Sequence, residues 1–190
     1  MKRKRIFDLI FSIIALLLLS AFLFFAFLLA SIDTQSFGIF FQKRIGRYGK
    51  PFLIYKFKTF HPKTNQVSTL GSFFRNYKID EWPQLINVLK GDMSVVGPRP
   101  DVPGYYDVLE GEARKIIQLR PGLTSEAAIK YRNEEVLLAK QTNPTKYNDE
   151  VIFPDKVRMN LHYFYSHSFK GDLRIIWRTI FSGNTMQSER

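Results

Sequence analysis

The first part of the chain is a long apolar segment. Residues 9–32 include no charged side chain. As a helix, these 24 residues would extend about 36 Å, which exceeds the roughly 30 Å of the hydrocarbon core of a bilayer. A secretory signal peptide has a shorter apolar core, of about 7–15 residues. The hydrophobic pattern therefore predicts a membrane segment over residues 1–34.

Basic residues on both sides of this segment bear on its topology. The positive-inside tendency places basic flanks on the cytoplasmic side of the membrane. A straight span would place one of the two basic flanks on the opposite side. A segment that enters the bilayer and returns to the same face would satisfy both. Ser20, at the midpoint, could bond back to a preceding carbonyl and bend the helix, although residues 9–32 contain no proline or glycine. These residues leave a span and a re-entrant hairpin equally open. The flanking basic residues are Lys2, Arg3, Lys4, Arg5, Lys43, Arg44, Arg47 and Lys50.

Beyond residue 34 the apolar periodicity alternates between strand-like and helix-like stretches. Residues 37–44 and 51–58 predict two strands, joined by a turn at 46–49 into a hairpin. Residues 92–100 predict a brief strand that enters a stiff turn, and residues 120–124 predict a turn. The predicted helices span residues 68–77, 103–119, 133–168 with interruptions at Asn143-Pro144 and Phe153-Pro154, and 172–181, where Leu173, Ile176, Trp177 and Ile180 share one face.

These elements predict an α+β fold: a mostly helical compact domain with a short β-hairpin, preceded by the membrane helix. We see no internal repeat and no linker to a second domain. The expected boundaries are residues 1–34 for the membrane segment, 35–182 for the compact domain and 183–190 for a frayed polar tail.

The stretch from Lys78 to Gly91 places two adjacent carboxylates, Asp80 and Glu81, where a loop turns into a short helix. Asp80 is a good N-cap, and Gly91 is a good stop signal. Two interpretations of the acids are open: a plain cap with a neighbour matched to the helix dipole, or a pair fixed at a helix mouth for chemistry. The helical spacing of the apolar residues predicts a buried face formed by Trp82, Leu85, Ile86 and Leu89.

The amino-acid composition limits the classes of binding partner and the types of reactive site that the chain can have. Lys and Arg number 28 against 17 Asp and Glu, so the net charge is +11 and the pI is about 9.8. Such a charge implies an anionic partner: nucleic acid, an anionic lipid surface or a phosphorylated substrate. The absence of cysteine excludes disulfides, thiolate metal sites and cysteine nucleophiles. His61, His162 and His167 lack metal-ligand spacing, and the sequence contains no P-loop and no dinucleotide-binding glycine motif.

An acidic pair in a basic, membrane-attached chain suits phosphoryl chemistry. A carboxylate can attack phosphorus and form an aspartyl-phosphate type of intermediate, and a neighbouring carboxylate can hold Mg²⁺, which shares oxygen ligands with phosphates. Lys56 and Lys58 lie on the basic edge of the second strand, which suits contact with phosphates or headgroups. Arg99 stands between Pro98 and Pro100, which stiffen the backbone and favour a bidentate grip on phosphate.

Several motifs, taken in their order along the chain, resemble the bacterial sugar transferases, in particular the small monotopic polyprenol-phosphate phosphoglycosyl transferases. The similarity covers nearly the whole chain, and the combination is highly specific although each motif alone is weak. The motifs are Lys4-Arg5 with Phe7-Asp8; Arg44, Gly46 and residues 49–52; residues 54–59; Arg75; Asp80-Glu81 with residues 83–85; residues 87–94; residues 96–100; and residues 121–124.

The resemblance implies a ping-pong reaction on the cytoplasmic face of the bacterial inner membrane. Asp80 would attack the sugar-linked phosphate of a nucleotide-sugar, usually a UDP-sugar, and release UMP. Undecaprenyl phosphate, a polyprenol phosphate, would then take the phosphosugar, and this step initiates the assembly of a membrane-linked glycan. Glu81 would bind Mg²⁺, and Arg75 and Arg99 would contact phosphate. The family's membrane segment is a re-entrant helix-break-helix, which agrees with the two basic flanks.

The implied partners are the nucleotide-sugar donor, the polyprenol phosphate acceptor and a bilayer with anionic headgroups, without nucleic acid; a homodimer stays open. Three departures from the family pattern matter, of which Lys58-Thr59-Phe60 in place of the common Arg-Thr-Met is a minor one. Ser20 is followed by Ala21 where the family usually has Ser-Pro, and residues 125–133 differ in a segment associated with the sugar nucleotide, so the sugar is not assigned. The alternative functions are a membrane-tethered basic binding module and an inactive scaffold of the same fold.

Overall fold

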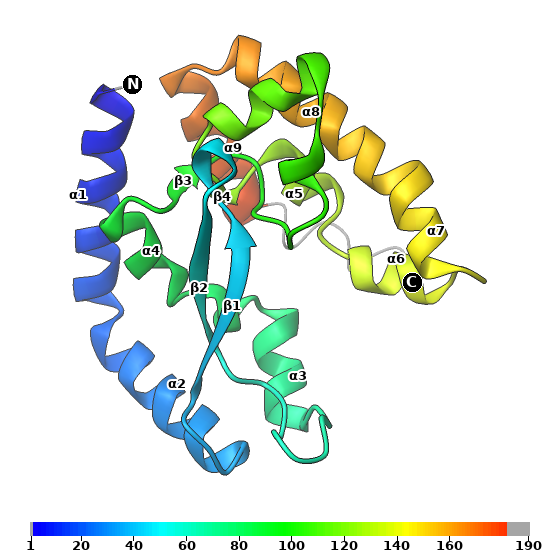
Figure 1. The fold of residues 1–190 in the computed structure, drawn as a ribbon. Coiled ribbons are helices and arrows are strands. Elements are labelled where there is room, and N and C mark those ends of the chain that lie inside the picture. Colours follow the sequence, from blue (N-terminus) through cyan, green and yellow to red (C-terminus); the bar gives the residue numbers. More distant parts are fainter. Residues whose placement is uncertain (1, 182–190) are drawn as a thin grey trace. The chain divides into compact units, whose positions relative to one another are not determined.

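The computed structural model describes residues 2–181 (Figure 1). The chain forms two compact units. Within the described residues, the first contains residues 2–44 together with Pro51–Met93, and the second contains Ile45–Lys50 and residues 94–181. Helices dominate, and two short sheets of two strands each complete the fold, so the predicted α+β class is confirmed. The predicted tail, residues 183–190, lies outside the described residues.

The apolar segment at the start of the chain forms two helices of the first unit, α1 (Lys2–Leu18) and α2 (Ser20–Asp33). They meet at Leu19 with a bend of 67°. Ser20 Oγ donates to the carbonyl of Leu17 at 2.9 Å, which is the backward bond that the sequence suggests for a bend. Within residues 2–181 no single helix is both long and apolar enough to cross a bilayer, but this bent pair meets that criterion by length and composition.

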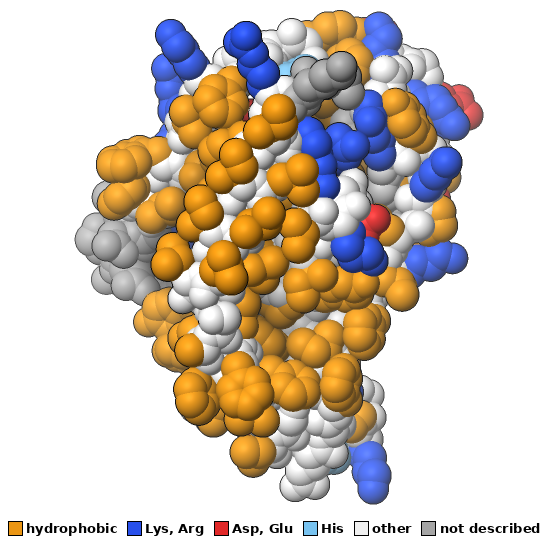
Figure 2. Space-filling view, turned by 90° about the vertical axis from the view of Figure 1, so that its left-hand side faces the viewer, with side chains coloured by type: hydrophobic (Ala, Val, Ile, Leu, Met, Phe, Trp, Pro, Cys, Tyr) orange, Lys and Arg blue, Asp and Glu red, His pale blue; other side chains and the backbone are white. Residues whose placement is uncertain are grey.

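Hydrophobic side chains cover most of the outer face of α1 and α2 (Figure 2). Ala26 and Ala30 of α2 are buried in a core cluster with Phe57, Phe74 and Ile79, and the partly buried Leu23 and Phe27 of the same helix pack against it. A contiguous exposed apolar surface of this kind is typical of a site that meets a membrane or another protein. The exposed members include Ile10, Ile14, Leu17, Leu18, Phe25 and Leu29.

The predicted hairpin is confirmed. β1 (Ile39–Ile45) and β2 (Pro51–Phe57) pair in one sheet, and the connection between them contains the 3₁₀ turn η1 (Arg47–Gly49). The next predicted helix is also present as α3 (Thr69–Asn76), and Ser68 caps it by accepting a hydrogen bond from a backbone N–H in the first turn. Turn residues and a capping serine are local signals, and here they sufficed.

The region around the acidic pair differs from the prediction. Asp80 is not a helix cap, because Ile79–Glu81 form a separate 3₁₀ turn, η2, and α4 (Gln84–Lys90) begins only after Pro83. Proline has no N–H to donate to the carbonyl four residues earlier, so the turn cannot continue into an α-helix through residue 83. Gly91 ends α4 with a left-handed φ of 95°, as predicted.

The buried face of α4 also differs from the prediction, since Ile86 and Leu89 are 41% and 37% exposed. The cause is a long-range polar contact. Asn87 Nδ2 donates to the carbonyl of Leu53 at 2.7 Å, and Asn87 Oδ1 accepts from the N–H of Tyr55 at 3.1 Å. These bonds turn the polar face of α4 towards β2. The buried residues of α4 are Gln84, Leu85, Asn87 and Val88.

The end of α4 is held by α1, which lies alongside it in the first unit (Figure 1). The guanidinium of Arg5 donates to the carbonyls of Val88 and Leu89 at 2.6 and 2.9 Å. The last carbonyls of a helix have no partner within the helix, and a cation at this end also matches the helix dipole. Helix α1 thereby completes the C-terminus of the helix that follows the acidic pair.

The second unit contains a short parallel sheet of β3 (Ser94–Val96) and β4 (Gly122–Thr124), in which Ser94 pairs with Gly122 and Val96 with Thr124. Residues 120–124 were expected to form only a turn, so this strand is a correction. A strand of three residues has too little periodicity to be recognised, and its partner lies far away in the sequence. A Cβ on Gly122 would lie 2.1 Å from the backbone nitrogen of Gly97, so the close approach requires glycine.

Two predicted helical features of the second unit are wrong. Residues 103–119 form 3₁₀ segments and not one regular helix, and Phe153-Pro154 does not interrupt the last long helical region. Pro154 occupies the first turn of α8 (Phe153–Ser166), where a missing N–H costs nothing, and a π-helical turn joins this helix to α7 (Pro144–Tyr147). The remaining elements are η3 (Tyr106–Val108), η4 (Gly111–Gln118), α5 (Glu126–Lys130), α6 (Glu134–Ala139), α7 (Pro144–Tyr147), η5 (Asn148–Ile152), α8 (Phe153–Ser166) and α9 (Phe169–Phe181).

Helix α9 begins three residues earlier than predicted. Its buried residues are Asp172 and Ile175, and Asp172 accepts a hydrogen bond from Tyr163 Oη at 2.6 Å. Within the described residues, Leu173, Trp177 and Ile180 of the predicted apolar face are exposed. The helix is therefore anchored to the second unit largely through polar contacts, which also include the hydroxyls of Thr179 and Thr124 and the ion pair of Arg178 with Glu126.

Candidate active site

The acidic pair lies on the short turn η2 of the first unit. Lys78 enters the turn in the left-handed conformation with a φ of 56°, and the N–H of Trp82 closes it by donating to the carbonyl of Ile79 at 3.1 Å. The side chains of Asp80 and Glu81 are 11% and 15% exposed. Two adjacent carboxylates are thus held in a rigid turn with little access to solvent.

Lys56 reaches both acids from β2. Its ammonium lies 3.1 Å from Glu81 Oε1 and 3.9 Å from Asp80 Oδ2, and the lysine side chain is 17% exposed. The sequence placed Lys56 among the phosphate-binding residues, and the structure brings it together with both members of the pair. A cation at this distance offsets the repulsion between two neighbouring carboxylates.

Two further predicted site residues belong to the first unit. Arg75, at the end of α3, donates from Nε to Thr59 Oγ1 at 2.8 Å, and this bond fixes the base of the guanidinium. Lys58 donates from Nζ to Ser36 Oγ at 3.0 Å. Lys56 and Lys58 are two residues apart on the same edge, yet the first bonds to the acidic pair and the second to the loop after α2.

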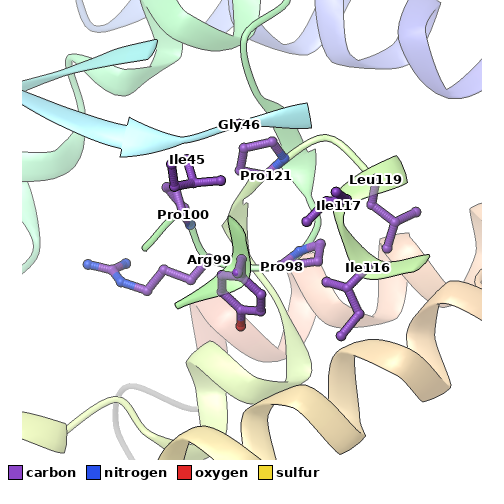
Figure 3. Close-up of a pocket in the computed structure, with 10 residues that line it drawn as sticks. Ile45, Gly46, Pro98, Arg99, Pro100, Ile116, Ile117, Leu119 and Pro121 are labelled. Atoms are coloured by element: carbon purple, nitrogen blue, oxygen red, sulfur yellow. The ribbon is translucent and has the colours of Figure 1, made fainter. Parts of the chain in front are cut away.

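Arg99 belongs to the second unit, where it follows β3 in the chain. Pro98 and Pro100 line a small pocket of about 20 Å³ together with other apolar residues, and the guanidinium of Arg99 extends away from these side chains (Figure 3). The two prolines thus anchor the backbone in an apolar cluster and present the charged group outward. The cluster is formed by Ile45, Tyr106, Ile116, Ile117, Leu119 and Pro121.

Comparison with known proteins defines the family. The family described as bacterial sugar transferase matches residues 1–185. The chain belongs to this family. The match includes every residue that the sequence analysis proposed for the site, from Lys56 to Arg99.

Individual relatives support the same assignment. The uncharacterized sugar transferase EpsL of Bacillus subtilis is 32% identical over 187 residues, which cover 93% of this chain and 85% of EpsL. The UDP-glucose:undecaprenyl-phosphate glucose-1-phosphate transferase of Caulobacter vibrioides is 31% identical over 196 residues, covering 94% of this chain and 68% of the relative. A putative undecaprenyl-phosphate N-acetylgalactosaminyl 1-phosphate transferase of Bacillus subtilis is 35% identical over 121 residues, which cover 57% of this chain and 68% of the relative.

In this bacterial sugar transferase, sequence reasoning missed the supporting role of Asn87. Its fully buried side chain joins α4 to β2, and so fixes the helix after the acidic pair against the strand that carries Lys56. The available signal was an asparagine within an otherwise apolar run of α4, because a buried amide needs specific partners. Its partners could not be named from the sequence, since they lie more than thirty residues away.

Replacement of Asn87 by leucine should destabilise the protein. The variant removes a donor and an acceptor and leaves the carbonyl of Leu53 and the N–H of Tyr55 without this partner, so we expect a loss of about 2–3 kcal/mol in the free energy of unfolding. Thermal unfolding of the detergent-solubilised protein, followed by circular dichroism, measures the effect. Asn76→Leu at an exposed position of α3 is the matched control. Equal Tm values for the two variants would contradict the prediction.

Proposed function

We propose that this protein transfers a sugar-1-phosphate from a UDP-sugar to undecaprenyl phosphate and releases UMP. The observation that carries the proposal is the poorly exposed pair Asp80–Glu81, bridged by Lys56, in a chain of the bacterial sugar transferase family. Relatives named as undecaprenyl-phosphate sugar-1-phosphate transferases support the same reaction class for this chain. The product would be the first lipid-linked intermediate of a glycan.

Asp80 would be the nucleophile. One of its carboxylate oxygens forms a bond to the phosphorus that carries the sugar. The bond from that phosphorus to the bridging oxygen of the diphosphate breaks, and UMP leaves with its electron pair. An oxygen of undecaprenyl phosphate then attacks the same phosphorus and expels the Asp80 carboxylate. The sugar ends on the lipid through a diphosphate, and the enzyme regains its free acid.

A magnesium ion fits this site if the substrate shares it. Within residues 2–181 no group of three or more His, Cys, Asp or Glu side chains is arranged to hold a metal. Mg²⁺ commonly takes one or two carboxylates and completes its shell with water and substrate phosphates. Glu81, with Asp80 beside it, offers this donor set, and we assign Glu81 as the ligand. The ion would neutralise charge on the diphosphate.

The remaining cations would bind the phosphates of the donor. Arg75 bonds to Thr59 through Nε, and its two terminal nitrogens are the atoms suited to a bidentate grip on a phosphate. Arg99 presents its guanidinium from the stiff Pro98–Pro100 turn, Lys56 contributes an ammonium group from β2, and Lys58 contributes one from the residue that follows this strand. Each would stabilise charge that grows on the non-bridging oxygens during transfer.

A lipid acceptor requires that the nucleophile lies close to the bilayer. Trp82, directly after the acidic pair, packs on Phe22 of α2 with ring centroids 5.0 Å apart. We propose that residues 1–34 enter the cytoplasmic leaflet of the bacterial inner membrane as a re-entrant pair and that residues 35–182 lie on the cytoplasmic face. The exposed apolar face of α1 and α2 would contact acyl chains, and the basic flanks would contact anionic headgroups.

Cysteine labelling tests this topology, because the chain has no cysteine of its own. Arg3→Cys precedes the bent pair and Lys50→Cys follows it, and both positions are exposed. In intact spheroplasts we expect an impermeant maleimide to label neither site, and in inside-out vesicles to label both. Labelling after detergent treatment is the control for reactivity. Labelling of the two sites from opposite sides would contradict the re-entrant arrangement.

The reaction itself is tested by UMP release. The full chain in detergent or nanodiscs is incubated with Mg²⁺, undecaprenyl phosphate and each member of a panel of UDP-sugars. One UDP-sugar should give UMP and an equal amount of sugar diphosphate lipid. A membrane-tethered binding module or an inactive scaffold would give no UMP with any sugar, and that result would overturn the proposal.

A further inference from the structure

We infer that the ammonium of Lys56 occupies the cation-binding position beside Asp80 and Glu81. A divalent metal ion must therefore displace this ammonium in order to bind Glu81. The inference rests on the proposed function, because it takes Glu81 as the metal ligand. It adds a role that the proposed function does not contain: Lys56 is a positioning residue that exchanges one anionic partner for another.

The geometry supports a cation position. The ammonium lies 3.1 Å from Glu81 Oε1, as a direct hydrogen bond, and 3.9 Å from Asp80 Oδ2. Lys56 is therefore close to one oxygen of each acid, and it places a positive charge where Glu81 would hold a metal ion. All three side chains are at least four-fifths buried, so solvent screens these charges weakly.

The strand fixes the origin of the lysine side chain. Ile54 and Phe57, on either side of Lys56, are buried, and the N–H of Tyr55 is bonded to Asn87. The backbone of β2 therefore cannot move away from the acidic pair without disrupting the core. The lysine side chain itself is flexible, with four carbons between the backbone and the charge, so only the ammonium end has to move.

A metal ion and this ammonium exclude one another. Mg²⁺ binds a carboxylate oxygen at about 2.0–2.1 Å, so an ion on Glu81 would stand within a few ångströms of the present ammonium position. Two cations that share one oxygen repel strongly in a poorly solvated site. The ammonium of Lys56 binds Glu81 with a single charge and no coordination bond. The divalent ion has to compete with it for the carboxylate oxygen.

If the metal ion must displace the ammonium of Lys56, the affinity for the metal ion should depend on whether the diphosphate donor is bound. The free protein should bind a divalent ion weakly, because Lys56 already neutralises the acids. A diphosphate donor brings negative charge that can receive the displaced ammonium, so donor and metal ion should strengthen each other's binding. Lys56 would then leave the acids and pair with phosphate at the moment when Asp80 must be free to attack.

The test is Mn²⁺ binding to the full-length protein in nanodiscs without any nucleotide-sugar, measured by electron paramagnetic resonance. Lys56→Met keeps the length of the side chain and removes the charge, and we expect the affinity for Mn²⁺ to rise at least about tenfold. Lys56→Gln is a second neutral variant with the same expectation. Lys56→Arg keeps the charge and should bind Mn²⁺ as weakly as the wild type.

Lys58→Met is the matched control, because it removes the same charge from the same edge at a residue that bonds to Ser36. We expect its affinity for Mn²⁺ to change less than about twofold, because its ammonium bonds to Ser36 and not to the acidic pair. Equal or weaker Mn²⁺ binding in both Lys56→Met and Lys56→Gln, with folding intact by circular dichroism, would overturn the inference.

A double variant separates this inference from the proposed function. Glu81→Gln in the Lys56→Met background should remove the gain in Mn²⁺ affinity. If the gain persists without Glu81, the assignment of Glu81 as metal ligand is wrong. If Glu81→Gln abolishes Mn²⁺ binding in the wild type but Lys56→Met brings no gain, the ligand assignment stands and only the competition is refuted.

Discussion

Asp80→Asn should lower the rate of UMP release by about 10⁴-fold or more, the scale of effect seen when a covalent nucleophile is removed. The amide is nearly the same size as the carboxylate, so the turn η2 and its neighbours should keep their packing. An amide oxygen is a far weaker nucleophile towards phosphorus, and it cannot form the aspartyl intermediate. Turnover with the preferred UDP-sugar and the Tm of the variant are the two measurements.

Intact-protein mass spectrometry makes this prediction specific. Wild-type protein incubated with the UDP-sugar but without undecaprenyl phosphate should gain the mass of one phosphosugar, because the second half of a ping-pong reaction cannot proceed. Asp80→Asn should gain nothing. Wild-type turnover in Asp80→Asn, or a phosphosugar adduct on that variant, would refute the assignment of the nucleophile.

Glu81→Gln should lower turnover by about 10²–10³-fold, comparable with the loss of one strong electrostatic contact to the transition state. The variant removes both the proposed metal ligand and the ion pair of 3.1 Å with Lys56. Chelation of Mg²⁺ should inactivate the wild type, and the residual activity of Glu81→Gln should require a higher Mg²⁺ concentration. A Mg²⁺ titration of both proteins measures the shift.

Glu134→Gln is the matched control for this substitution. Glu134 forms an ion pair with Lys156 at 2.7 Å in the second unit, so the same charge and a similar contact are lost at a residue with no proposed role in transfer. We expect turnover of this variant to stay within about twofold of the wild type, as for a partly exposed pair. An effect of Glu81→Gln no larger than that of Glu134→Gln would contradict the role of Glu81.

The elements that the sequence predicted correctly all have local causes. The hairpin depends on two stretches rich in apolar and aromatic residues and on a turn with two glycines, and α3 depends on a capping serine. The end of α4 depends on a glycine that accepts a left-handed φ of 95°. In each case the deciding atoms lie within a few residues of one another, so the order of the amino acids is sufficient.

The elements that the sequence missed depend on distant partners. Ile86 and Leu89 fit a buried helical face, but the bonds of Asn87 to β2 turn α4 the other way. Strand β4 consists of only three residues and is defined by its pairing with β3. Such contacts bring together residues far apart in the chain, and no local periodicity encodes them.

The features of the candidate site also fall into those that the sequence determined and those that depend on contacts between distant residues. The sequence by itself determined the adjacent acids, the excess of basic residues, the lack of cysteine and, through the order of its motifs, the family that the comparison confirms. Only the tertiary structure decided that the acids lie on a 3₁₀ turn before Pro83 and that the ammonium of Lys56, not that of Lys58, reaches them. The physical reason is that side-chain type follows from the chain itself, whereas the distance between two charges follows from how strands and helices pack.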